Sequence, residues 1–363
     1  MARSAPYDPD VAEAMNAFFK STRRSFSRYF VPPSHRDDPS SIAKTYAKFL
    51  NSDSWRVNLI TRPGNRGRYA VGMSIGSANL EFLTKRSALV ADTLLLSHSG
   101  QGLYHKVQEG FHSGGSRGSA ITGDPPAPER NEDEIGFICP DITEVGKWIL
   151  DAKELLTQGR VWYMPSFARR LDDRIEALSQ PAPIDFLIHD RLLVPSSPER
   201  PLVKDAIRVV LQLDLPFVDG VSLKEFCKIT VGEAYAYEGF RNLLRRKVLE
   251  LDSALDAVHS ERALALLNME ISDGLREVEA KMRDIKGMRR FARGTVVGAT
   301  AATLYAARGD ALPSAIEAIV STMIGGGGLL FDYWQSGKEQ SGRVDELRTS
   351  GWYYIWRLDS RRR

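Results

Sequence analysis

Apolar residues recur at steps of three and four positions in two stretches of the chain, and this spacing predicts amphipathic helices. The first stretch is 10–30, and basic residues occupy the opposite face of this predicted helix. Its apolar positions are Val11, Met15, Phe18, Phe19, Phe26 and Phe30. The second stretch, 233–293, is too long for one ordinary globular helix, so we expect a break near His259.

Short apolar runs bounded by Gly, Pro and Asn predict strands in the first half of the chain. The predicted strands are 55–61, 69–75, 88–97 and 161–164. The loop 62–68 is rich in Gly, Pro and Asn and suits a hairpin between the first two. Between the last two strands, 142–158 has helical spacing, with Asp141 as its N-cap and Gly159 at its end. This alternation of strand and helix indicates an α/β unit.

The pattern changes after Leu192, where helical spacing dominates. Ser222 and Glu225 form a capping box that predicts a helix start. The sequence therefore predicts a helix-rich α+β fold, in which an N-terminal α/β unit with a few strands is followed by a C-terminal helical domain. We expect the first unit to span 1–195 and the helical domain 196–363, because 194–201 is rich in Pro and Ser.

The composition is that of an ordinary globular protein, with 43% hydrophobic and 26% charged positions among 363 residues. Two cysteines, Cys139 and Cys227, exclude a disulfide scaffold and a four-cysteine zinc site, and they suit a reducing cytoplasm. The net charge of +3 hides a gradient, since residues 1–126 carry +6, residues 127–191 carry −5 and residues 192–363 carry +2. A basic first third suggests a surface for a partner or a contact with the acidic middle.

Two basic groups in the first third predict a nucleic-acid surface. Arg23, Arg24 and Arg28 stand among aromatic residues, and Arg62, Arg66 and Arg68 stand on the predicted hairpin loop. Arginines hold phosphates, and aromatic rings between them permit stacking on bases. The alternative is a solvated basic face that pairs with the acidic segment 127–191.

The sequence contains no phosphate-binding loop, no dinucleotide fingerprint and no H-E-x-x-H. Asp185, His189 and Asp190 are the best candidates for a metal-dependent hydrolase or nuclease. A seven-residue spacing would put His98, His105 and His112 on one face of a helix, but glycines interrupt that segment. We therefore predict no catalytic residues, no metal site and no cofactor, and we lean towards a protein that is not an enzyme.

The most apolar part of the chain is 294–334, directly after a basic run that ends in Arg289, Arg290 and Arg293. A basic flank beside two apolar helices is typical of a membrane-active hairpin or a partner-binding surface. The first apolar run is only 14 residues long, however, and four glycines interrupt the second. A buried helical hairpin is therefore the alternative.

These patterns together favour a cytoplasmic, non-catalytic binding or scaffold component that contacts nucleic acid through its basic N-terminal surface. A membrane-acting effector that uses 294–334 and a metal-dependent hydrolase or nuclease are the two alternatives. Another protein, a second copy of the chain and a membrane are the further candidate partners.

Overall fold

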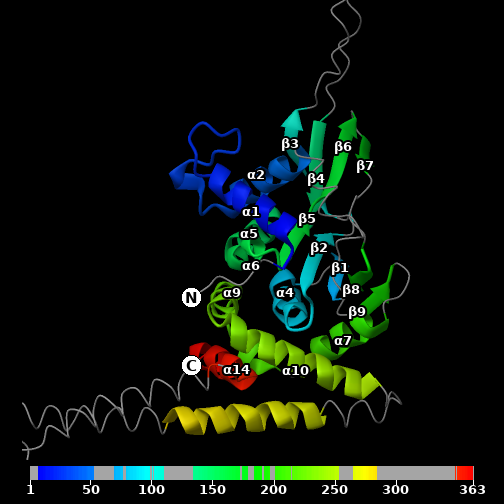
Figure 1. Ribbon diagram of the computed structural model, residues 1–363. Coiled ribbons are helices and arrows are strands. Elements are labelled where there is room, and N and C mark those ends of the chain that lie inside the picture. The colour runs from blue at the N-terminus through cyan, green and yellow to red at the C-terminus, as the bar shows by residue number, and fades with distance from the viewer. Residues whose placement is uncertain are drawn as a thin grey trace, which may run out of the picture.

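The computed structural model describes residues 7–52, 69–76, 79–98, 100, 102–109, 134–171, 174–178, 184–189, 192–196, 201–213, 215–252, 265–283, 348 and 350–362. In this part of the chain, two β-sheets lie beside a set of helices, which confirms the helix-rich α+β fold class (Figure 1).

The first sheet, as far as the described residues show it, has five strands in the order β5-β2-β1-β8-β9. Its strands are β1 (Ala70–Ile75), β2 (Thr93–His98), β5 (Val161–Met164), β8 (Phe186–His189) and β9 (Leu192–Pro195). The first four are parallel to one another, whereas β9 runs antiparallel to β8. The chain moves outward from β1 through β2 to β5 and then returns to β8 on the other side of β1. The direction of strand addition therefore reverses between β1 and β8, which makes a topological switch point.

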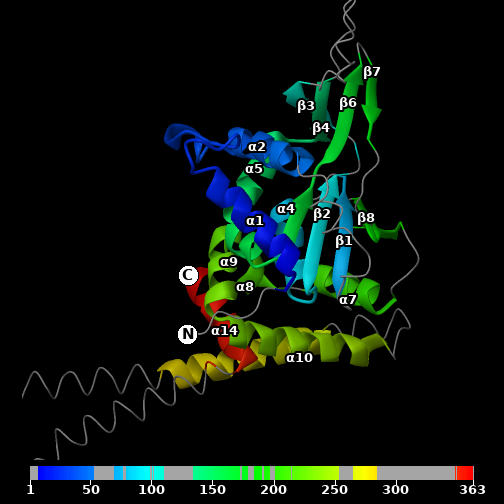
Figure 2. The same ribbon diagram turned by 45° about the horizontal axis from the view of Figure 1, so that its top comes forward.

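The second sheet is antiparallel, with the order β3-β4-β6-β7 in the described residues. Its strands are β3 (Leu103–Glu109), β4 (Glu134–Cys139), β6 (Ser166–Leu171) and β7 (Arg174–Ala177). Because β3 follows β2 and β6 follows β5 after short connections, this sheet rises from the carboxyl ends of β2 and β5 (Figures 1 and 2). Gly102 in the first connection has φ +131°, and a Cβ there would lie 2.3 Å from the carbonyl carbon of Cys139. Glycine is therefore required where the chain passes between the sheets.

Several helices of the first half gather beside the sheets (Figure 1). They are α1 (Pro9–Ser21), the short 3-10 helix η1 (Pro33–His35), α2 (Pro39–Ser52), α4 (Leu80–Ala88), α5 (Ile142–Asp151) and α6 (Lys153–Thr157). Side chains of Asp8, Asn79 and Asp141 accept hydrogen bonds from the first-turn amides of α1, α4 and α5. The N-cap predicted at Asp141 is thus confirmed.

The second half forms a helical layer against α4 (Figure 2). Its helices are α7 (Pro201–Gln212), α8 (Pro216–Asp219), α9 (Leu223–Gly232), α10 (Ala234–Asp252), a helix over 265–283, and α14 (Gly351–Arg362). The hydroxyl of Ser222 accepts from the amide of Glu225 at 3.3 Å, which confirms the predicted start of α9. The hydroxyls of Tyr354 in α14 and Thr230 in α9 lie 2.8 Å apart in the core.

Buried cations connect the first half of the chain to this layer. Arg86 of α4 pairs with Asp219 and donates to the carbonyl of Val210 at 3.0 Å. Its neighbour Lys85 donates to the carbonyl of Val221 at 2.7 Å. One apolar core extends through both halves. The division into units 1–195 and 196–363 stays a prediction.

The predicted helix over 10–30 is wrong in its second half, because α1 ends at Ser21. The hydroxyls of Ser21 and Thr22 bond back to the carbonyls of Phe18 and Phe19, and a series of turns follows.

Two further boundaries differ from prediction. The 142–158 helix is divided at Ala152 into α5 and α6, and α4 occupies residue 88, so the strand predicted over 88–97 begins only at Thr93.

Several predicted elements lie outside the described residues, namely the strand 55–61, the loop 62–68, the helix break near His259 and the apolar segment 294–334.

Candidate functional site

The chain between Thr22 and Val31 forms a closed loop on the surface, which we call the 22–31 loop. The amide of Val31 donates to the carbonyl of Thr22 at 3.0 Å, so the two ends of the loop meet. Inside it, the amide of Ser27 donates to the carbonyl of Arg24 at 2.9 Å. Thr22, Tyr29 and Val31 are buried and anchor the loop. These bonds give the exposed residues between them a defined backbone.

Three of the predicted nucleic-acid ligands, Arg23, Arg24 and Arg28, are exposed on the 22–31 loop. Phe26 stands between them and is fully exposed, at 104%. Arg28 donates from Nε to the hydroxyl of Tyr29 at 2.5 Å, and its guanidinium lies 4.8 Å from the centre of that ring. No described residue forms an ion pair with Arg23 or Arg24. Both side chains are exposed to solvent in the described part of the chain.

The other predicted basic ligands cannot be placed beside this loop. Arg62, Arg66 and Arg68 lie outside the described residues, as do Arg289, Arg290 and Arg293 before the apolar segment.

The predicted hydrolase residues include one whose place is clear. Asp185 is buried at the start of β8, where its Oδ2 accepts from the amide of Gly72 in β1 at 2.8 Å. Its own amide donates to the carbonyl of Gly72 at 2.9 Å. This carboxylate thus joins two parallel strands, a structural task. The backbone of His189 ends β8, whereas its side chain and Asp190 lie outside the described residues.

The histidines and cysteines have structural environments. His98 ends β2 and His105 lies in β3, so no single helix carries them, and His112 lies outside the described residues. His98 Nδ1 lies 2.9 Å from the hydroxyl of Tyr163, and burial lowers the pKa of His98 to about 4.

Burial raises the pKa of Cys139 to about 12, which opposes a thiolate nucleophile. In the described part of the chain, no group of three His, Cys, Asp or Glu could hold a metal ion.

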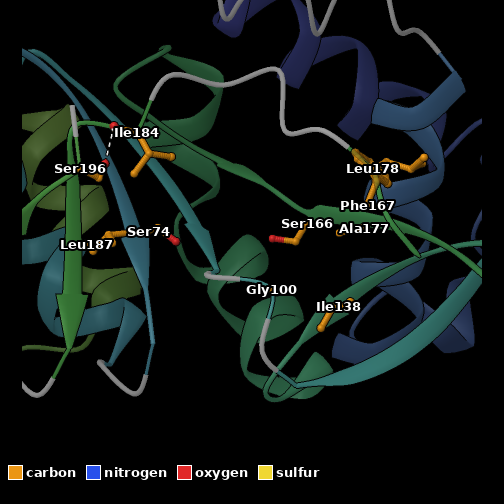
Figure 3. A pocket seen from close by; sticks show the side chains of 10 residues that line it. All are labelled: Ser74, Gly100, Ile138, Ser166, Phe167, Ala177, Leu178, Ile184, Leu187 and Ser196. Atoms are coloured by element: carbon orange, nitrogen blue, oxygen red, sulfur yellow. Dashed lines mark hydrogen bonds between the residues drawn. The ribbon is translucent and has the colours of Figure 1, made fainter. Parts of the chain in front are cut away.

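A pocket of about 400 Å³ opens between the two sheets at the switch point (Figure 3). Its walls are formed by Ser74, Gly100, Ile138, Ser166, Phe167, Ala177, Leu178, Ile184, Leu187 and Ser196. Figure 3 shows the side chains of Ser74 and Ser166 pointing toward one another across the space. Ser166 donates to the carbonyl of His98 at 2.6 Å, and Ser196 donates to the carbonyl of Ile184 at 2.7 Å.

Sequence reasoning missed this pocket, because its three serines belong to three separate segments of the chain. One local signal was overlooked: Ser74 is the central residue of Gly72-Met73-Ser74-Ile75-Gly76, a G-x-S-x-G sequence at the end of β1. Only the strand order brings Ser74 of β1, Ser166 of β6 and Ser196 after β9 to one place. The alternation of strands and helices was a second usable signal, since such sheets bind ligands at the carboxyl ends of their strands.

The N-terminus of α4 follows β1 at this edge, and two of its first-turn amides already have partners. The side chain of Asn79 accepts from Phe82 N at 3.1 Å, and the amide of Leu80 donates to Glu144. Burial raises the pKa of Glu144, and the bond from Leu80 opposes that rise. A carboxylate thus occupies the position where a helix N-terminus would hold a ligand phosphate.

Among the described helices, none is both long enough and apolar enough to cross a bilayer. Searches of protein-family models, of curated proteins and of solved structures give no match to this chain.

Proposed function

We propose that the protein is a non-catalytic binding component that contacts single-stranded nucleic acid through the 22–31 loop. The observation that carries this proposal is the fully exposed Phe26 between three exposed arginines. Guanidinium groups pair with phosphates, and an exposed ring stacks on bases of any sequence.

The closed backbone of the loop supports the proposal. One exposed phenylalanine is common on protein surfaces and needs no functional explanation. Here, however, the ring stands on a loop whose ends are hydrogen-bonded and whose flanking residues are buried. Less conformational entropy is lost when such a loop binds a strand than when a flexible one does.

The arginines provide the first test. Fluorescence anisotropy would measure binding of a labelled oligonucleotide by the full chain at several salt concentrations. Each phosphate contact to a single strand contributes a slope of about 0.7 to the dependence of log K on log salt. We expect the double variant Arg23→Gln/Arg24→Gln to lower this slope by about 1.4 and to weaken binding.

A matched control removes two other exposed cations. Arg276 and Lys281 lie on the helix 265–283, with side chains 80% and 53% exposed. Arg276→Gln/Lys281→Gln changes the net charge by the same amount and should leave the salt slope within error. Equal slopes for the two double variants would contradict the proposal.

Phe26 provides the second test, and it separates single strands from duplexes. Phe26→Ala should weaken binding of a single strand about tenfold, because it removes one stacked base. Tyr235→Ala is the control, since Tyr235 is an aromatic residue 72% exposed on α10. A duplex that binds as well as the single strand, with no effect of Phe26→Ala, would rule out stacking as the mode of contact.

A cytoplasmic location belongs to the same proposal. Cys139 and Cys227 are buried free thiols, which suits a reducing compartment. The membrane and hydrolase alternatives stay predictions, because 294–334 lies outside the described residues and Asp185 bonds to a neighbouring strand.

A further inference from the structure

We propose that the pocket between the two sheets binds an uncharged ring compound of nucleoside size that offers hydroxyl or amino donors. This site is separate from the 22–31 loop, and the two proposals can fail independently.

The position of the pocket is the first argument. In open α/β sheets, ligands bind outside the carboxyl ends of the strands at the point where strand order reverses. Ser74 of β1 and Leu187 of β8 flank this point, and they are paired in register, so their side chains lie on one face of the sheet. The volume of about 400 Å³ lies in the usual range of small-molecule sites.

The charge of the walls restricts the ligand. None of the described residues that line the pocket is charged. A phosphate or carboxylate placed there would lose its hydration without meeting a cation among these described lining residues. The N-terminus of α4 is a poor substitute, because Glu144 and Asn79 already accept from two of its first-turn amides, those of Leu80 and Phe82. We therefore infer a neutral ligand.

The serine hydroxyls further restrict the chemistry of the ligand. Ser166 and Ser196 donate their hydrogens to the carbonyls of His98 and Ile184, so any bond from them to a ligand uses oxygen lone pairs. Ser74 makes no hydrogen bond with a described residue, although it is only 4% exposed, and its hydroxyl points into the pocket (Figure 3). Two of the three hydroxyls thus act as acceptors, which selects a ligand that donates through O–H or N–H groups.

The apolar side chains on the pocket walls are the reason to expect a flat ring in the ligand. Leu187 is 41% exposed on one wall, although it lies in a strand of the sheet, and Ile138 lies on the other. A flat ring between these side chains would cover Leu187 and remove apolar surface from water. A nucleoside combines such a ring with several hydroxyl donors, and it matches both walls and hydroxyls.

The test uses the full chain and two neutral probes, adenosine and uridine, in isothermal titration calorimetry. We expect saturable binding of at least one probe, and at least tenfold weaker binding of adenosine 5′-monophosphate. No saturation by either nucleoside, or equal or tighter binding of the monophosphate, would overturn the proposal.

Two variants locate the binding. Ala177 is exposed and lines the pocket, whereas its neighbour Glu176 is exposed on the opposite face of β7. Ala177→Trp should abolish binding by filling the space, and Glu176→Trp should bind as the wild type does. Ser74→Ala, a smaller change, should weaken binding several-fold to tenfold through loss of one hydrogen bond. Undiminished binding by Ala177→Trp and Ser74→Ala would show that the nucleoside binds elsewhere.

Discussion

The cations of α4 and those of the 22–31 loop lie in opposite environments. Lys85 and Arg86 are each 3% exposed and are held by Asp219 and by carbonyls of the helical layer. Arg23 and Arg24 are exposed. All four belong to the basic first third of the chain, so its net charge of +6 overstates what a partner can reach. A charge count identifies a basic segment, whereas burial decides which of its cations act outside the molecule.

Two phenylalanines, one buried and one exposed, test the contrast between buried and exposed side chains. Of the three tests, this one has the largest expected effect on the free energy of unfolding. Phe18 is fully buried, with its ring centre 5.2 Å from that of Tyr46 and 5.5 Å from that of Phe49. We expect Phe18→Ala to lower the free energy of unfolding by about 4 kcal/mol through lost burial and a cavity. Phe26→Ala in the loop should change it by less than about 0.5 kcal/mol. Urea unfolding measures both, and a large effect at Phe26 would mean that its ring packs against the protein.

Arginines test the same contrast between buried and exposed side chains, and the expected difference in the free energy of unfolding is smaller. Arg86→Ala would leave Asp219 and the carbonyl of Val210 without their partner, and we expect a loss of about 3 kcal/mol in urea unfolding. Arg23→Gln/Arg24→Gln should stay within about 0.5 kcal/mol of the wild type. If both variants unfold at the same urea concentration, the division between structural and available cations is wrong.

The pH dependence of stability at His98 also tests the contrast between buried and exposed groups, and its expected effect is the smallest of the three. Its pKa is about 4 in the folded protein because of burial, against about 6.5 in an unfolded chain. The unfolded chain therefore binds more protons between these values, so stability present above pH 6.5 is lost as the pH falls towards 4. We expect this histidine to account for a loss of about 2 kcal/mol between pH 7 and pH 4.5.

The control for this prediction is His98→Gln, which keeps a polar side chain near Tyr163 without a titrating ring. Its stability should decline less steeply than that of the wild type between pH 6.5 and pH 5, above the range where most carboxylates titrate. Parallel declines would assign the acid sensitivity to other groups.

Local signals in the sequence were sufficient for part of the fold. The caps at Asp141 and Ser222 and the strand 161–164 were predicted and are present, because each depends on a few neighbouring residues. The end of α1 was missed because Phe26 and Phe30 continue the helical spacing. The hydroxyls of Ser21 and Thr22 end the helix instead, and Phe26 turns to solvent.

The two candidate sites also differ in how far the sequence alone could predict them. The arginines of the 22–31 loop could be named from the sequence, because charge and aromatic content are local properties. Of the pocket, Ser74 stands in a local sequence motif, Gly72-Met73-Ser74-Ile75-Gly76. The other walls could not be named, because β8 enters the sheet beside β1 after more than a hundred residues of intervening chain. Predicting it requires the strand order, which depends on the packing of the entire sheet.

The contact between α14 and the core has a consequence for the rate of folding. Tyr354 meets Thr230 across a sequence separation of 124 residues, and Arg241 meets Tyr7 across 234. Closing such long loops loses chain entropy before the contacts form, and high contact order slows folding. The helical layer should therefore be among the last parts to become native. Until α14 docks, the apolar surfaces of α9 and α10 that it covers are open to association with other unfinished chains.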